Sequence, residues 1–211
     1  MIPFEHYDAA IFDLDGVITD TAPLHFQAWK ALADQLHIPF GLDDNEHLKG
    51  VDRMGSLEFI LKLGNVMLPV DQKQQLATEK NEHYKKLLEQ LSAKDVLPGV
   101  RTVLEKLNQL GLKIGLASAS RNAPEILRAL DLFDHFDHIA KPELARSKPA
   151  PDIFLYAAYG VGVHPEKCIA FEDAVSGLKA IRASSMYAVS VGDSALSKYS
   201  DKHITSFIGC C

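Results

Sequence analysis

The chain has 211 residues, of which 47% are hydrophobic, and its formal net charge at pH 7 is -6. This length suits one good-sized domain or a core domain with a smaller insert, and the composition is ordinary for a globular protein. An acidic chain gains little from counterion release, which disfavours a nucleic-acid partner. An anionic substrate must therefore be held by a local cluster of positive groups or by a metal ion.

The cysteines and the N-terminal segment indicate the compartment. Cys168, Cys210 and Cys211 are odd in number and irregular in spacing, unlike a disulfide framework. The first residues include acidic side chains where a signal peptide would carry basic ones, and no apolar run is long enough to span a bilayer. We therefore expect a soluble, cytoplasmic protein with no membrane partner.

The first predicted element is a strand at residues 9–12, a near-continuous apolar run of the kind that is buried on both faces of a parallel sheet. Asp13 and Asp15 follow it, and residues two apart on a strand point the same way. Gly16 then lets the backbone turn away. One carboxylate can serve as nucleophile and the other as general acid and base. The alternative is a surface turn, which the apolar lead-in and the continuation to Thr21 disfavour.

The stretch that follows has a different pattern. It contains no convincing strand but three segments with helical spacing, at residues 25–36, 56–63 and 71–91. We therefore expect a helical cap domain over residues 20–92, inserted into a core domain of residues 1–19 and 93–211.

Beyond Leu97-Pro98-Gly99, apolar runs alternate with helical patterns. Strands are predicted at residues 113–117, 168–171 and 187–191. Helices are predicted at residues 100–110, from near Pro124, from near Pro151 and over 174–183. This alternation implies an α/β fold with a parallel sheet and right-handed crossovers.

Two polar segments of the core are candidates for phosphate binding. Residues 118–122 offer hydroxyl and N–H groups at a helix N-terminus, which can cradle a phosphate or simply cap the helix. In residues 147–152 two prolines stiffen a loop around Lys148, whose ammonium can neutralise a phosphoryl group. The alternative for Lys148 is an exposed loop lysine, the usual fate of lysine.

A further polar segment, Glu172-Asp173, ends another apolar run. Its carboxylates suit Mg²⁺, or form an acidic helix N-terminus favoured by the helix dipole. Ligands of open α/β sheets bind at the carboxyl ends of the strands, so the polar segments predict one composite site. Asp13, Asp15 and Asp173 would repel one another there, by roughly 4 kcal/mol per pair at about 4 Å and an effective dielectric constant of ~20. A divalent cation and Lys148 would relieve that repulsion.

These segments, in this order and spacing, resemble the four motifs of the haloacid dehalogenase superfamily. The matching residues are Asp13-Leu14-Asp15-Gly16, Ser118, Lys148 and Glu172-Asp173, and the resemblance spans nearly the whole chain. It implies a Rossmann-like core with a parallel sheet and a helical cap. Asp15 resembles the phosphotransferase members and argues against the dehalogenases.

The resemblance also implies roles for core residues. Asp13 would be the phosphorylated nucleophile, and Asp15 would give and take the proton of a sugar hydroxyl. Mg²⁺ would be held by Asp13, by the backbone carbonyl of Asp15 and by Asp173, with Glu172 nearby. The transferring phosphoryl group would be held by Ser118, Ala119 and Lys148, and the substrate also by Asn122.

In the cap, the resemblance implies that Arg53 grips a distal phosphate, a task that suits a bidentate guanidinium. The other implied substrate contacts are Thr21, His25, Trp29, Lys49, Gly50, Val51 and Ser56. Trp29 can instead be core packing, and His25 a buried, hydrogen-bonded histidine. Lys49 and Arg53, four residues apart, can instead form a solvated helix face.

The reaction implied is the interconversion of β-D-glucose 1-phosphate and D-glucose 6-phosphate, through phosphorylated Asp13 and a 1,6-bisphosphate, by a monomer whose partner is a small sugar phosphate. A Mg²⁺-dependent sugar-phosphate phosphatase is the alternative, since it shares every core residue. A catalytically silent module that only binds phosphorylated ligands is a further alternative, which the intact set of Asp13, Asp15, Lys148 and Asp173 disfavours.

Overall fold

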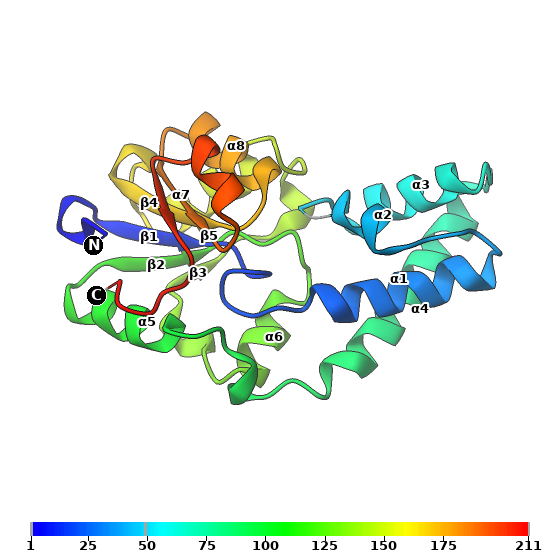
Figure 1. Cartoon of the computed structure of the whole chain (residues 1–211), viewed down its shortest axis with the longest axis horizontal. Coiled ribbons are helices and arrows are strands. Elements are labelled where there is room, and N and C mark those ends of the chain that lie inside the picture. The colour runs from blue at the N-terminus through cyan, green and yellow to red at the C-terminus, as the bar shows by residue number, and fades with distance from the viewer. Residues whose placement is uncertain (1, 49, 211) are drawn as a thin grey trace.

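The computed structural model describes residues 2–48 and 50–210. Its centre is a six-stranded sheet of order β3-β2-β1-β4-β5-β6, in which every pairing is parallel (Figure 1). The strands are β1 (Ala9–Phe12), β2 (Lys113–Leu116), β3 (His138–Ile139), β4 (Cys168–Glu172), β5 (Tyr187–Val191) and β6 (Lys202–Ile204). The predicted α/β class with a parallel sheet is confirmed.

Helices cover both faces of the sheet, because its central strand is apolar on both sides. Ala10 and Phe12 of β1 face one hydrophobic cluster, whereas Ala9 and Ile11 face the other. The first cluster includes residues of α5 (Val100–Gln109) and α6 (Ala123–Ala129), and the second includes residues of α7 (Asp152–Gly160) and α8 (Val175–Ala183). All four helices lie where the sequence predicts them.

The four predicted strands are present, but β3 and β6 were not predicted. Both lie at edges of the sheet, span two and three residues, and are only partly buried. A strand this short, with no continuous apolar run, leaves no periodic signal in a sequence.

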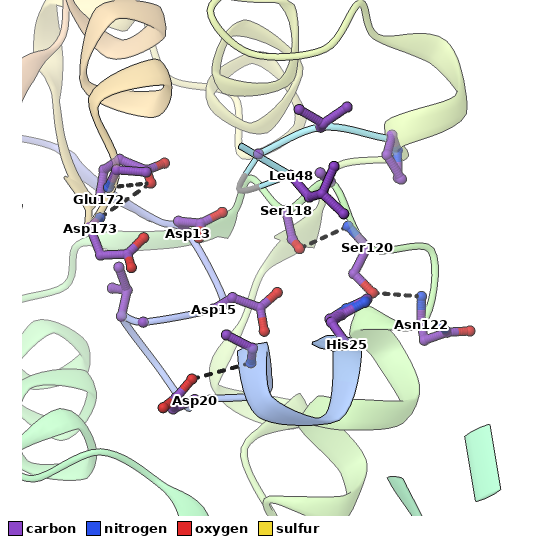
Figure 2. Close-up of a pocket in the computed structure, with 18 of the residues that line it drawn as sticks. Asp13, Asp15, Asp20, His25, Leu48, Ser118, Ser120, Asn122, Glu172 and Asp173 are labelled. Carbon is purple, nitrogen blue, oxygen red and sulfur yellow. Dashed lines mark hydrogen bonds between the residues drawn. The ribbon is translucent and has the colours of Figure 1, made fainter. Parts of the chain in front are cut away.

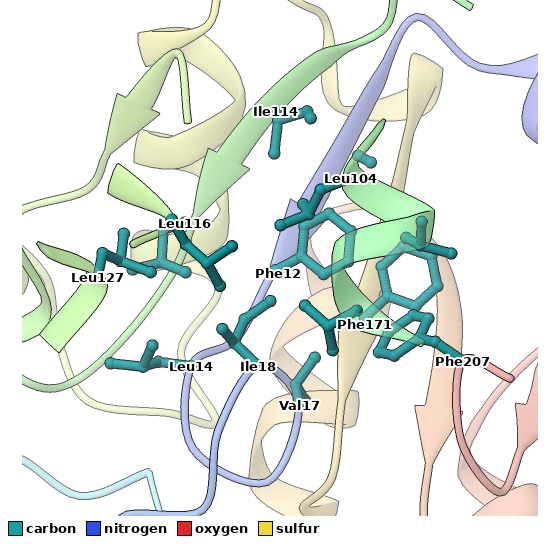
Figure 3. Close-up of a cluster of buried hydrophobic side chains, with 14 of the residues drawn as sticks. Phe12, Leu14, Val17, Ile18, Leu104, Ile114, Leu116, Leu127, Phe171 and Phe207 are labelled. Carbon is teal, nitrogen blue, oxygen red and sulfur yellow. The ribbon is translucent and has the colours of Figure 1, made fainter. Parts of the chain in front are cut away.

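An aromatic cluster ties the end of the described chain to the centre of the sheet (Figure 3). The rings of Phe12 and Phe171 stack with centroids 4.7 Å apart. Phe207, which follows β6, lies 5.3 Å from Phe171 and 6.0 Å from Phe12. Burying one such ring contributes about 1.5–3 kcal/mol, so the segment after β6 covers this face of the core rather than trailing from it.

The stretch between β1 and the return to the core is helical, as predicted, and forms the right-hand part of Figure 1. Its helices are α1 (Ala22–Gln35), α2 (Leu42–Glu46), α3 (Arg53–Leu63) and α4 (Val70–Leu88). They enclose a hydrophobic cluster of their own that includes Trp29, Leu57 and Ile60. The five-residue helix α2 was not predicted. We retain residues 20–92 as the proposed cap domain and residues 1–19 and 93–211 as the proposed core domain.

Short 3-10 helices occur in the connections, at Phe4–His6, Ala93–Asp95, Phe133–His135, Pro142–Leu144, Pro165–Lys167 and Ser194–Tyr199. Within residues 2–48 and 50–210, no helix combines the length and the apolar character that crossing a membrane would require.

Replacing Gly99 by alanine should destabilise the fold more than the same change at Gly111. Both glycines have positive φ, +85° and +75°, where an alanine costs about 1 kcal/mol or somewhat more. At Gly99 the new Cβ would also lie 2.4 Å from the carbonyl carbon of Phe207, whereas at Gly111 nothing lies within 4 Å. Overpacking should add about 1–3 kcal/mol at Gly99. Urea denaturation of both variants tests this, and equal losses would show that the segment after β6 does not press on Gly99.

Candidate active site

The site is a cavity of about 680 Å³ between the carboxyl ends of the central strands and the cap helices. Figure 2 shows its two sides: Asp13, Glu172 and Asp173 gather on one, and Ser118, Ser120 and Asn122 lie across from them. The side chains follow β1, β2 and β4, three adjacent strands, so the topology brings together segments far apart in sequence. Ligand sites of open α/β sheets occur at this edge.

Lys148 lies at the centre of the acidic side. Its Nζ is 2.6 Å from Oδ1 of Asp13 and 2.7 Å from Oε2 of Glu172, and its side chain is 2% exposed. The alternative of an exposed loop lysine is therefore wrong. A buried ion pair is costly unless its charges are matched, and here one ammonium serves two carboxylates.

Burial controls the protonation of these groups. Burial raises the pKa of Asp13 and of Glu172 to about 7, although the charge of Lys148 opposes the change in both. Burial alone would lower the pKa of Lys148, but Asp13 and Glu172 together raise it. The lysine stays charged, and once both carboxyl groups are ionised they hold more negative charge than it can neutralise.

The surplus negative charge fits a divalent cation. Asp13, Glu172 and Asp173 each offer a carboxylate oxygen, and these oxygens lie within 4.8 Å of one another. Asp173 can approach because Gly16 lacks a side chain: a Cβ there would lie 2.1 Å from its Oδ2. Hard cations take such oxygen ligands. The residues present therefore fit a metal. The alternative of an acidic helix N-terminus does not describe Glu172, because Glu172 is the last residue of β4 and α8 begins only at Val175.

Asp15 points away from this cluster, into a chain of hydroxyl groups. Thr21 Oγ1 donates a hydrogen bond to Oδ1 of Asp15 and accepts one from Tyr84 Oη at 3.0 Å. Burial, and then the charge of Asp13, raises the pKa of Asp15 to about 6. A carboxyl group with such a pKa can both hold and release a proton near neutral pH.

His25, which is partly buried, and the buried Lys80 form a pair beside Asp15. Lys80 Nζ lies 2.9 Å from Nδ1 of His25 and 4.5 Å from the ring centroid of Trp29. Burial, and then the charge of Lys80, lowers the pKa of His25, so His25 is neutral and its Nδ1 can accept from Lys80 when the lysine is charged. Burial, and then the charge of Arg53, lowers the pKa of Lys80 to about 7. His25 is thus hydrogen-bonded, as the alternative has it, but it is only partly buried and it lines the cavity.

The segment after β2 forms the opposite wall. The backbone N–H of Ser120 donates to Oγ of Ser118 at 3.0 Å, and that of Asn122 donates to Oγ of Ser120 at 3.3 Å. Asn122 precedes α6 but its side chain makes no capping hydrogen bond. Its amide instead donates to Oδ1 of Asn81 at 3.0 Å, so ordinary capping does not explain Asn122.

Arg53 reaches the cavity from the first turn of α3. The helix begins there because Oδ1 of Asp52 accepts from the N–H groups of Met54 and Gly55 at 2.9 and 3.0 Å, a standard N-cap. Arg53 is half-buried and lines the cavity, so it is not on a fully solvated helix face. Nη2 of Arg53 donates to Oδ1 of Asn81 at 2.7 Å. Arg121, which is exposed, also lines the cavity.

The remaining cap residues lie close to the core. Gly50, Val51 and Ser56 line the cavity, as does Ala119 across from them. A Cβ on Gly50 would lie 3.2 Å from Cδ of Lys148, so the cap meets the core at that glycine.

Three predicted residues stand apart from the rest. Trp29 is 3% exposed within the hydrophobic cluster of the cap, which supports the core-packing alternative, although part of it borders the cavity. Thr21 lies behind Asp15 rather than on the cavity wall. Lys49 lies outside the residues that the structure describes.

Lys80, Asn81 and Tyr84 on α4 were missed. Their helix is mostly polar, and a lysine or asparagine on such a helix is ordinarily solvated, so only the packing of α4 against the site distinguishes them.

Comparison with known proteins places this geometry among characterised folds. The model of the haloacid dehalogenase-like hydrolase family matches residues 7–184. The chain is 51% identical to a β-phosphoglucomutase of Bacillus subtilis, over 87% of this chain and 83% of that one. It is 34% identical to the fructose-1-phosphate phosphatase YqaB of Escherichia coli, over 89% and 98%. The crystal structure of a β-phosphoglucomutase from Clostridium difficile superposes with a TM-score of 0.93 at 41% identity, over 95% of this chain and 92% of that one.

Binding of a divalent cation should strengthen as the pH rises through neutrality. Folding raises the pKa of Asp13 and Glu172 to about 7, so the metal-free fold keeps protons that an unfolded chain loses near pH 4. These protons add stability at low pH, and that stability is lost as the pH rises through about 7. A cation must displace them, which makes its apparent Kd fall up to about tenfold per pH unit and per proton below the pKa. Calorimetric titration with MgCl₂ from pH 6 to pH 8 measures the change, and a constant Kd would contradict it.

Proposed function

The chain belongs to the haloacid dehalogenase-like hydrolase family, and we propose that within it the protein is a β-phosphoglucomutase, which interconverts β-D-glucose 1-phosphate and D-glucose 6-phosphate. Such an enzyme is a phosphomutase, an isomerase that moves a phosphoryl group within one molecule. The identity of 51% to the enzyme of Bacillus subtilis, over most of both chains, supports this assignment.

The observation that carries the proposal is that two separate groups of cationic side chains lie at the cavity, which we take as its two ends. At one end Lys148 contacts Asp13, where a phosphoryl group would be transferred. At the other end Arg53 and Arg121 line the wall. Burial, and then the positive charge of Arg121, lowers the pKa of Arg53. Two guanidinium groups that repel one another are a good site for a second, non-reacting phosphate. A mutase needs both ends, because its intermediate carries two phosphates.

The proposed mechanism assigns one task to each group of the acidic side. Asp13 is the nucleophile that carries the phosphoryl group, and Lys148 neutralises charge on both the nucleophile and that group. Ser118 and the backbone at Ala119 hold the phosphoryl oxygens. Mg²⁺, held by Asp13, Asp173 and the backbone carbonyl of Asp15 with Glu172 beside it, would supply charge neutralisation during transfer.

Asp15 is the proposed general acid and base. It takes the proton of the attacking sugar hydroxyl when the phosphoryl group leaves Asp13, and it returns a proton when the bisphosphate phosphorylates Asp13 again. Thr21 fixes the Asp15 carboxylate through its hydrogen bond, and Tyr84 fixes Thr21. The bisphosphate turns over between the two steps, so each of its phosphates occupies each end of the cavity once.

A sugar-phosphate phosphatase is the second candidate. The 34% identity to the fructose-1-phosphate phosphatase of Escherichia coli shows how closely the two activities are related in sequence. The difference is the acceptor of the phosphoryl group, which is water in a phosphatase and a sugar hydroxyl in a mutase. The cap groups at the second phosphate end, Arg53 above all, favour the mutase.

We also propose that the protein acts as a monomer in the cytoplasm on a small sugar phosphate. Cys168 and Cys210 are free thiols, as suits a reducing compartment.

The product formed from β-glucose 1-phosphate decides between the two candidates. With Mg²⁺ and a catalytic amount of glucose 1,6-bisphosphate, we expect glucose 6-phosphate to form faster than free phosphate. Asp13→Asn should abolish both products, since it removes the nucleophile but keeps the size of the side chain. Free phosphate in excess over glucose 6-phosphate would favour the phosphatase. If Asp13→Asn behaved in this assay as the wild type does, Asp13 would not be the nucleophile and a protein that only binds phosphorylated ligands would be favoured.

Replacing Arg53 by alanine should affect the mutase reaction more than the hydrolysis of a small aryl phosphate. The aryl phosphate has no second phosphate, so it makes no use of the guanidinium. We expect kcat/KM for the mutase reaction to fall at least tenfold, the size of a lost charge-assisted hydrogen bond of about 1.5–3 kcal/mol. Steady-state kinetics with both substrates provide the measurement. If kcat/KM fell equally for both reactions, Arg53 would not bind the distal phosphate.

A further inference from the structure

Asn81 joins the cap to the core at the distal end of the cavity. It lies on α4 and is 9% exposed. Its Oδ1 accepts a hydrogen bond of 2.7 Å from Nη2 of Arg53 in the cap and one of 3.0 Å from Nδ2 of Asn122 in the core. One amide oxygen thus receives donors from both sides of the site.

These two donors belong to the side chains that the proposed function assigns to substrate. Arg53 of the cap and Asn122 of the core both line the cavity at the proposed distal phosphate position. A phosphate oxygen would accept from an arginine and an asparagine as an amide oxygen does. Without such an acceptor the 6% exposed Asn122 would keep a buried donor unpaired, at a cost of about 1–3 kcal/mol, and Arg53 would be free to turn elsewhere.

A neutral acceptor suits this place better than a carboxylate. Within the part of the chain that the structure describes, Arg53 forms no ion pair with a carboxylate, and its nearest oxygen partner is the amide of Asn81. A carboxylate at position 81 would bind the guanidinium more strongly and would repel an arriving phosphate. The amide orients Arg53 and leaves its positive charge available.

Resting on the proposed function, we propose that Asn81 is a positioning residue for the distal phosphate. Its Oδ1 stands in for a phosphate oxygen between turnovers, holds Arg53 and Asn122 in their binding orientations, and gives up both donors when the phosphate arrives. It would act chiefly through Arg53, and to a smaller extent through Asn122, and would not itself take part in phosphoryl transfer.

Kinetics of Asn81→Ala and Asn81→Asp test this role. For Asn81→Ala we expect KM for β-glucose 1-phosphate to rise about tenfold, with kcat and the hydrolysis of an aryl phosphate changed less than twofold. The near-isosteric Asn81→Asp should raise KM at least as much, because its carboxylate competes with the phosphate. Thr78→Ala, an exposed change on α4 whose hydroxyl bonds only the carbonyl of Gln74 at 2.9 Å, is the matched control and should keep wild-type values.

A double-mutant cycle with Arg53→Ala shows whether Asn81 acts through the arginine. If it does, the double variant should lose no more than about twofold in kcat/KM beyond Arg53→Ala alone. Three outcomes would each overturn the proposal. The first is that the losses in kcat/KM of the two single variants multiply in the double variant. The others are an equal fall in aryl phosphate hydrolysis and in the mutase reaction, and a wild-type KM in Asn81→Asp. None of these outcomes bears on the mutase assignment, which depends on the product that the wild-type enzyme forms.

Discussion

The rest of the site depends on the buried ion pairs that the ammonium of Lys148 makes with the carboxylates of Asp13 and Glu172. Parallel strands end at one edge of the sheet, so the fold itself forces acidic residues from β1 and β4 together. Burial then makes their charges costly, as the raised pKa values of both carboxyl groups indicate. The lysine offsets part of that cost, and a divalent cation would offset the rest.

The cap completes the site from the other side, and α4 contributes most. Tyr84 contacts Thr21 and through it Asp15, Lys80 contacts His25, and Asn81 contacts Arg53 and Asn122. One helix therefore reaches both Asp15, the proposed acid–base group, through Thr21, and Arg53 at the proposed distal phosphate position. A change in the position of α4 would alter the two ends together, which couples cap placement to chemistry.

The two ends of the cavity differ in charge, and this difference suits a substrate that must turn over. The end at Asp13 is acidic, contains Lys148 and has carboxylates that would hold a cation, whereas the end at Arg53 and Arg121 is basic. A bisphosphate can place either of its phosphates at either end, because both ends provide positive charge to it by different means. Ser118, Ser120 and Asn122 are joined by hydrogen bonds, which fix this wall of the cavity.

The sequence by itself determined the parallel α/β core, the helical insert and the acidic strand ends, because buried strands and helices leave periodic patterns and strand ends converge by topology. It also supplied the motifs that identify the family. Only the tertiary structure decided that Lys148 is buried, that Asn122 bonds across the cavity rather than capping α6, and that Lys80 and Asn81 belong to the site. A polar residue on a polar helix has no sequence signal for burial, since its surroundings come from segments distant along the chain.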